Sequence, residues 1–143
     1  MLNNSRIKNL FKSEIIAYAH CDIPCGIYDP NDAIQAAKTV VRMTELLEEL
    51  DFSGGPSPKL GNSMARYVNA KEIHAKKAKD DLLVLWTDYF KPEHLSKYPD
   101  LHEKIWNACK LGSYVKVNVD LGKAKEFQTA LEEIGEIFWE TKK

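Results

Sequence analysis

The chain has 143 residues, 44% of them apolar and 29% charged, which is typical of one globular domain with a hydrophobic core. Its 20 basic and 21 acidic residues nearly cancel, so we expect neither a nucleic acid nor a membrane surface as a partner. No apolar stretch approaches the ~20 residues that a membrane-spanning helix needs. An odd number of cysteines, three, favours a metal or redox role in a reducing, cytoplasmic compartment over a secreted disulfide framework.

Residues 1–19 form a segment that we expect to be detachable. The segment ends in Ala-Tyr-Ala at positions 17–19, a small-x-small pattern that peptidases favour. Lys12 and Glu14 interrupt the apolar region of about 7 to 15 residues that an export signal needs. We therefore expect a pro-segment that a maturation protease removes before His20. An amphipathic N-terminal helix is the alternative, because the apolar residues of this segment also follow helical spacing.

The rest of the chain has the periodicity of four amphipathic helices. Asp29 is a suitable N-cap for the first helix, with Pro30 at its first position, and the glycines and prolines of residues 53–58 end it. The second helix ends at Lys91, and a short turn with two prolines leads to the third. The apolar seams contain Ala33, Ala36, Val40, Met43, Leu47 and Leu50 in the first helix, Tyr67, Ala70, His74, Ala78, Leu82, Leu85 and Tyr89 in the second, Leu101, Ile105, Ala108 and Val115 in the third, and Ala124, Phe127, Leu131, Ile134 and Phe138 in the fourth. We predict an all-α fold, an up-down-up-down four-helix bundle spanning residues 20–143 with an N-terminal metal-binding hook.

Residues 20–30, which we call the hook, read His-Cys-Asp-Ile-Pro-Cys-Gly-Ile-Tyr-Asp-Pro. They place an imidazole, two thiols and a phenol within nine residues. An iron–sulfur cluster needs four thiolates, and only Cys109 remains elsewhere in the chain. Zinc would accept His20, Cys21 and Cys25, but this spacing matches none of the common structural zinc sites.

Cleavage before His20 would create another set of metal ligands. The new α-amine, the backbone nitrogen and thiolate of Cys21, and the thiolate of Cys25 would form a planar arrangement of two nitrogens and two sulfurs. Such a set suits nickel, because thiolates tend to reduce divalent copper. The imidazole of His20 is placed to be an axial ligand. Pro24 and Gly26 suit a tight loop that turns Cys25 back toward Cys21.

The hook resembles the nickel-binding motif of the nickel superoxide dismutases, whose precursors are cleaved before this histidine. Residues 85–92, 97–99 and 137–143 also resemble that family, so that the resemblance runs from His20 to the end of the chain. It implies a four-helix bundle that assembles into a homohexamer. It also implies one nickel ion per subunit, held by His20, Cys21 and Cys25, and dismutation of superoxide to dioxygen and hydrogen peroxide by one-electron cycling between divalent and trivalent nickel.

The same resemblance suggests roles for four further residues. Tyr28 resembles a tyrosine of the family that orders water over the open face of the metal. Tyr89 resembles the residue that acts as the partner of this tyrosine. Asp22 is a candidate for fixing the loop, and Lys91 matches a lysine near the entrance that would attract the anionic substrate. Without the resemblance, Tyr89 would be a core aromatic residue and Lys91 an ordinary solvated lysine at a helix end.

Two positions depart from the family pattern. Family members have a glutamate that supports the axial imidazole at the position of Ala36, and an arginine that supports this glutamate at the position of His74. We expect this outer support to be rebuilt, by His74 or a water, or to be weaker. His74 also reads as a core histidine. We expect His94 and His102 to be surface or capping residues, and Cys109 to be a small buried residue.

Two other classes of function are consistent with the hook. One is a thiol redox module in which Cys21 and Cys25 alternate between dithiol and disulfide without a metal. The other is a helical bundle that stores or delivers nickel without catalysis.

Overall fold

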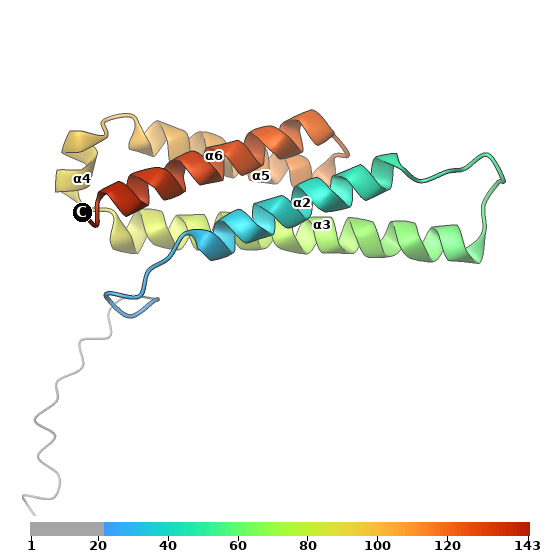
Figure 1. The fold of residues 1–143 in the computed structure, drawn as a ribbon, viewed down its shortest axis with the longest axis horizontal. Coiled ribbons are helices and arrows are strands. Elements are labelled where there is room, and N and C mark those ends of the chain that lie inside the picture. Colours follow the sequence, from blue (N-terminus) through green and yellow to red (C-terminus); the bar gives the residue numbers. More distant parts are fainter. Residues whose placement is uncertain (1–21) are drawn as a thin grey trace, which may run out of the picture.

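The computed structural model describes residues 22–143, so the expected pro-segment and the predicted ligands His20 and Cys21 lie outside the described residues. These described residues form helices and no strand (Figure 1). In chain order the elements are α2 (Asn31–Glu48), α3 (Pro58–Val84), the π-helical turn η1 (Leu85–Tyr89), α4 (Pro92–Lys97), α5 (Leu101–Val117) and α6 (Leu121–Glu140).

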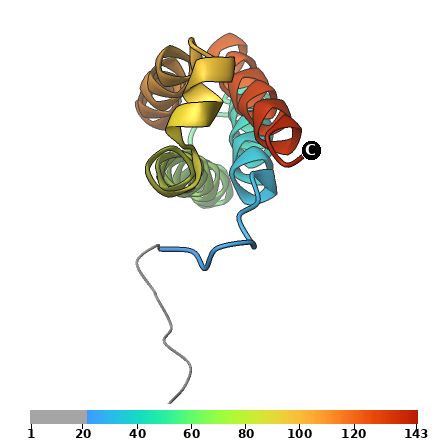
Figure 2. The same ribbon diagram turned by 90° about the vertical axis from the view of Figure 1, so that its left-hand side faces the viewer.

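The four long helices form the bundle. In the end-on view each packs beside two others, in the pairs α2–α3, α3–α5, α5–α6 and α6–α2 (Figure 2). Short connections make successive helices antiparallel, which confirms the predicted all-α bundle. The seams predicted for the third and fourth helices are buried at every position. No helix in residues 22–143 has the length and apolar character needed to cross a bilayer.

The start of α2 differs by one residue from the prediction. Asn31 is the first helical residue, and the N-cap position falls on Pro30, one residue after the predicted cap Asp29. Oδ1 of Asp29 accepts a hydrogen bond of 2.7 Å from the N–H of Asn31. The carboxylate thus satisfies one of the amide groups that a helix start leaves without a partner in the helix.

The first half of the α3 seam was predicted one residue too early. The structure buries Lys71 and Ala75 where the seam placed Ala70 and His74, which are half-buried. Lys71 Nζ donates hydrogen bonds to the carbonyl oxygens of Val115, at 2.6 Å, and of residues 116 and 118, at 2.8 and 2.9 Å. The lysine is buried because its ammonium group caps the carboxyl end of α5, where the helix dipole favours a cation.

The turn predicted between the second and third helices contains a short helix, α4, which begins at Pro92. Before it, α3 continues directly into η1, in which the N–H of Phe90 bonds to the carbonyl of Leu85 at 3.0 Å. A π-turn inserts one extra residue into a helical turn and thereby redirects the side chains that follow. Here those side chains include Asp88 and Tyr89.

Gly135 of α6 packs closely against the start of α2. A Cβ atom at this position would lie 2.9 Å from Cδ1 of Ile34, the end of a flexible side chain that would have to move, and at an ordinary contact distance of 3.6 Å from Cβ of Pro30. The carboxyl terminus, η1 and α4 lie at the same end of the bundle as residues 22–30 (Figure 1). The fold therefore gathers the hook and three distant segments at one end.

Candidate metal site at the end of the bundle

A pocket of about 280 Å³ lies where the hook meets η1, α4 and the end of α6. It is open on one side and combines thiol, phenol, imidazole, carboxylate and ammonium groups. The lining residues are Cys25, Gly26, Tyr28, Asp88, Tyr89, Lys91, His94, Thr141 and Lys142. Four of the residues proposed from the sequence, Cys25, Tyr28, Tyr89 and Lys91, are therefore brought together around one pocket.

The loop of the hook has the tight geometry expected from its proline and glycine. Gly26 has a φ of +96°, in the left-handed region that glycine adopts readily. The N–H of Ile27 donates to the carbonyl of Pro24 at 3.4 Å, which closes the turn around Cys25. Cys25 is exposed on the wall of the pocket.

Asp22 reaches the site through its backbone. Its N–H donates a hydrogen bond of 3.0 Å to Oδ2 of Asp88, which belongs to η1. The residue proposed to fix the loop is thus itself held by a carboxylate on the bundle. Charge-assisted hydrogen bonds of this kind are stronger than neutral ones.

Tyr28 and Tyr89 lie side by side beneath the pocket. Their ring centroids are 5.6 Å apart, and Tyr28 is only 5% exposed. The ring of Tyr89 also packs against Phe138, at 4.3 Å, and stacks on the ring of His94, at 5.6 Å. These contacts hold the plane of the half-buried Tyr89 ring.

The end of α6 supplies two further polar groups. Thr141 Oγ1 lies 2.7 Å from the hydroxyl of Tyr89. Lys142 Nζ donates to the backbone carbonyl of Tyr28 at 3.3 Å and lies 5.7 Å from the centroid of the Tyr89 ring. Lys142 and Lys91 therefore place two positive charges at a pocket that contains one carboxylate, Asp88.

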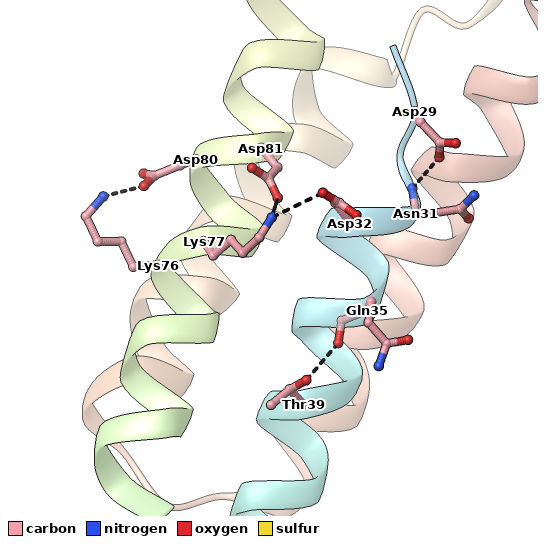
Figure 3. A network of polar contacts seen from close by, with 9 residues as sticks. All are labelled: Asp29, Asn31, Asp32, Gln35, Thr39, Lys76, Lys77, Asp80 and Asp81. Carbon is pink, nitrogen blue, oxygen red and sulfur yellow. Dashed lines mark hydrogen bonds and ion pairs between the residues drawn. The ribbon is translucent and has the colours of Figure 1, made fainter. Parts of the chain in front are cut away.

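An ion-pair network holds the base of the hook (Figure 3). Lys77 of α3 lies 3.7 Å from a carboxylate oxygen of Asp32 and is hydrogen-bonded to Asp81 on its own helix. The hydrogen bond to Asp81 is the main cause that raises the pKa of Lys77 above its ordinary value. The network links the start of α2 to α3 directly below the hook.

The two positions that depart from the family pattern lie away from the pocket wall described above. Ala36 is buried in α2 with 2% exposure. His74 is half-buried on α3, and its Nδ1 lies 2.8 Å from the carbonyl of Ala70, so this nitrogen carries the proton that it donates. One of the two ring nitrogens of His74 is therefore hydrogen-bonded within α3.

Four residues that line the pocket had no predicted role at the site: Asp88, His94, Thr141 and Lys142. A signal was present for three of them, because Asp88, Thr141 and Lys142 belong to the two segments, residues 85–92 and 137–143, that resemble the family. His94 does act as a cap, since its Nδ1 accepts from the N–H of Lys91 at 3.2 Å, and His102 accepts from Trp86 at 2.7 Å. His94 lies in the pocket as well.

The donor set is compatible with a metal centre completed by the preceding residues. Within residues 22–143, no group of three or more His, Cys, Asp or Glu side chains is arranged to hold a metal. Cys25 supplies one thiol at the pocket, a ligand type that soft and borderline metals accept. The other expected ligands, His20 and Cys21, directly precede Asp22 in the sequence. The contact between Asp22 and Asp88 holds the residue to which they are joined next to a residue that lines the pocket.

Comparison with known proteins agrees with this arrangement. The model of the family described as nickel-containing superoxide dismutase matches residues 15–142. The chain is 36% identical over 137 residues to the superoxide dismutase [Ni] of Streptomyces coelicolor, covering 96% of this chain and 98% of the relative. It is also 36% identical over 140 residues to the protein of the same name from Streptomyces seoulensis, with the same coverage.

A solved structure of native nickel superoxide dismutase has a similar fold, with a TM-score of 0.71 and 38% sequence identity. The match covers 87% of this chain and all of the solved chain. The family match spans the hook, the four bundle helices and nearly all of the C-terminal segment that lines the pocket. This chain therefore belongs to the nickel-containing superoxide dismutase family.

Proposed function

We propose that this chain dismutates superoxide at a nickel ion held by His20, Cys21 and Cys25 after cleavage before His20. Family membership gives the reaction and the metal. The observation that carries the proposal to particular residues is the pocket, in which Cys25 lies beside Tyr28, Tyr89 and Lys91. One copy of the expected ligand set is available in each subunit.

The bound nickel would supply one-electron chemistry, in its divalent and trivalent states. One superoxide gives up an electron and becomes dioxygen, and a second takes up one electron and two protons and becomes hydrogen peroxide. The buried face formed by Tyr28 and Tyr89 would order water over the metal and keep the reacting oxygens away from bulk solvent. Asp88 would hold the loop through the amide of Asp22.

Lys91 and Lys142 would attract the anionic substrate to the pocket. Positive charge at the mouth of a concave site raises the rate of encounter with anions, and the effect falls with increasing ionic strength. Both lysines are exposed, and Nζ of Lys142 also lies 5.7 Å from the ring centroid of Tyr89 and 4.9 Å from that of Phe138. Lys142 would therefore share the role of attracting the substrate that the family resemblance suggests for Lys91.

The lengths of the matches support removal of residues 1–19. The curated relatives are matched over 98% of their length by 96% of this chain. The match to the solved native protein covers all of that protein and 87% of this chain. Residues 20–143 are 124 of the 143 residues of this chain, which is also 87%. A free α-amine at His20 would then be present as a nitrogen ligand.

We further propose a cytoplasmic homohexamer. Two tryptophans, Trp106 and Trp139, are 59% and 43% exposed on the single chain, and exposed aromatic residues are enriched at protein interfaces. The odd number of cysteines supports a reducing compartment.

Nickel content and dismutation in protein trimmed to begin at His20 test the proposal. We expect one nickel per chain and activity in the parent, loss of both in Cys25→Ser, and retention of both in the matched control Cys109→Ser, whose thiol is half-buried elsewhere on α5. Activity in a metal-free sample would overturn the proposal in favour of thiol redox chemistry. Stoichiometric nickel without activity would overturn it in favour of storage.

A further inference from the structure

The hydroxyl of Thr141 has two hydrogen-bonding neighbours. Its Oγ1 lies 2.6 Å from the backbone carbonyl oxygen of Phe138 and 2.7 Å from the hydroxyl oxygen of Tyr89. A threonine hydroxyl has one proton to donate, and a carbonyl oxygen can only accept. The proton of Thr141 is therefore donated to Phe138. The second contact is a hydrogen bond only if the phenol of Tyr89 donates its own proton to Thr141.

We infer that Thr141 is a positioning residue that holds the phenol proton of Tyr89 in a hydrogen bond along the wall of the pocket. The phenol oxygen then presents only lone pairs to the reacting species, so Tyr89 acts there as an acceptor. The catalytic consequence of this inference rests on the proposed function, because it assumes that the reaction occurs in this pocket. The direction of the hydrogen bond itself does not depend on nickel or on activity.

Both partners are held rigidly enough to fix this direction. Thr141 directly follows α6, and its N–H bonds to the carbonyls of Ile137 and Phe138, both at 3.1 Å. The ring of Tyr89 packs against the rings of Tyr28, Phe138 and His94. These contacts fix the positions of the two hydroxyl oxygens, and the carbonyl of Phe138, which can only accept, sets the direction of the two hydrogen bonds.

The consequence concerns the protons of the reaction. Superoxide has no hydrogen to donate, so an acceptor-only Tyr89 cannot hydrogen-bond to it directly. Tyr89 can hold a water molecule that donates one proton to the phenol oxygen and directs its other proton elsewhere in the pocket. The two protons that become part of hydrogen peroxide would then come through water or another donor, and Tyr89 would orient the water and keep its own proton.

The direction of the bond can be read by ultraviolet resonance Raman spectroscopy of the uncut, metal-free chain. The phenol C–O stretching band lies at lower wavenumber when a tyrosine donates a hydrogen bond than when it only accepts one. The difference between the parent and Tyr89→Phe isolates the band of Tyr89. We expect it at the donor position in the parent and in Thr141→Ser, and at higher wavenumber in Thr141→Val. An acceptor-type band in the parent, or an unchanged band in Thr141→Val, would overturn the inference.

The catalytic consequence is measured separately in trimmed, nickel-loaded protein. Because a neutral hydrogen bond contributes about 0.5–1.5 kcal/mol, we expect kcat to fall roughly two- to tenfold in Thr141→Val at equal nickel content. Thr141→Ser should restore the parental value and its pH profile. Equal losses in both variants would overturn the positioning role and indicate a general effect on packing. Absence of dismutation in the parent would instead overturn the proposed function, and the Raman result would still decide the direction of the bond.

Discussion

The backbone N–H of Asp22 donates a hydrogen bond of 3.0 Å to Oδ2 of Asp88, across 66 positions of sequence. The contact joins the hook to η1, the π-helical turn that also carries Tyr89. One element of the bundle therefore both holds the loop and supplies a wall of the pocket.

Replacement of this carboxylate should weaken metal binding. Removing a charged hydrogen-bonding partner costs about 1.5–3 kcal/mol, so we expect Asp88→Ala to raise the dissociation constant for nickel roughly 10- to 100-fold in trimmed protein. Asp88→Asn keeps an acceptor oxygen and should show a smaller effect. Competition with a chromophoric chelator measures the affinity. The control is Asp80→Ala, which removes a carboxylate paired with Lys76 on the surface of α3. Equal affinity in Asp88→Ala and the parent would contradict the docking role.

A second prediction concerns the charge of Lys142. A unit charge about 6 Å from the path of an anion changes its energy by roughly 0.7 kcal/mol in water, or about threefold in rate. We expect Lys142→Gln to lower kcat/KM about threefold at low ionic strength and to have little effect in high salt. Lys143→Gln removes a charge from the next residue, which does not line the pocket, and should change much less. A loss that is independent of salt would argue for a purely structural role.

Lys71 should be important for stability because it caps α5. Lys71→Met leaves three carbonyl oxygens without the ammonium donor. We expect a loss of about 1–3 kcal/mol in the free energy of unfolding, measured by urea denaturation. Lys76→Met changes an exposed lysine of the same helix and should cost much less. An equally stable Lys71→Met variant would show that these carbonyls are satisfied in another way.

The pH dependence of this contribution has a definite sign. Burial lowers the pKa of Lys71 below the ordinary value of 10.5. In the window between the lowered pKa and 10.5 the unfolded chain binds more protons than the folded chain, so stability should rise with pH there. Relative to Lys71→Met, the parent should therefore gain stability as the pH increases through this window. If the stability of the parent relative to Lys71→Met falls with increasing pH over this range, the lowered pKa of Lys71 is contradicted.

The two described cysteines should differ in reactivity. Burial raises the pKa of the Cys109 thiol, an effect that the nearby charge of Lys79 opposes less strongly. Only the thiolate is nucleophilic, and each unit of pKa lowers its population roughly tenfold below the pKa. At neutral pH, iodoacetamide should therefore label the exposed Cys25 much faster than Cys109 in the metal-free chain. Peptide mass spectrometry measures both rates, and similar rates would contradict the burial of Cys109.

Hydrophobic periodicity was sufficient to predict the bundle. The predicted seam of α6 repeats every three or four residues and that of α5 every three, four or seven, neither contains a charged residue, and all the predicted positions are buried. The first half of α3 misled the same reasoning, because its buried position is a lysine. A hydropathy pattern treats lysine as exposed, and only the tertiary contact with the end of α5 explains Lys71.

The pocket could be predicted only in part. The hook motif identified Cys25 and Tyr28, and the family resemblance suggested Tyr89 and Lys91. The contact between Lys142 and Tyr28 joins residues 114 positions apart, and no local spacing in the sequence indicates it. The group of Asp22 that donates to Asp88 is its backbone N–H, which every residue except proline has. The residue type at position 22 could therefore not predict this hydrogen bond.

The central claim is that the α-amine of His20, released by cleavage, is a metal ligand. It is tested most directly by comparing nickel binding and superoxide dismutation in the full chain and in protein trimmed to begin at His20. The account predicts that the trimmed protein binds one nickel per chain and is active, while the full chain, whose residue 20 nitrogen is an amide, forms no such centre and is inactive. Equal nickel spectra and equal activity in the two proteins would contradict it.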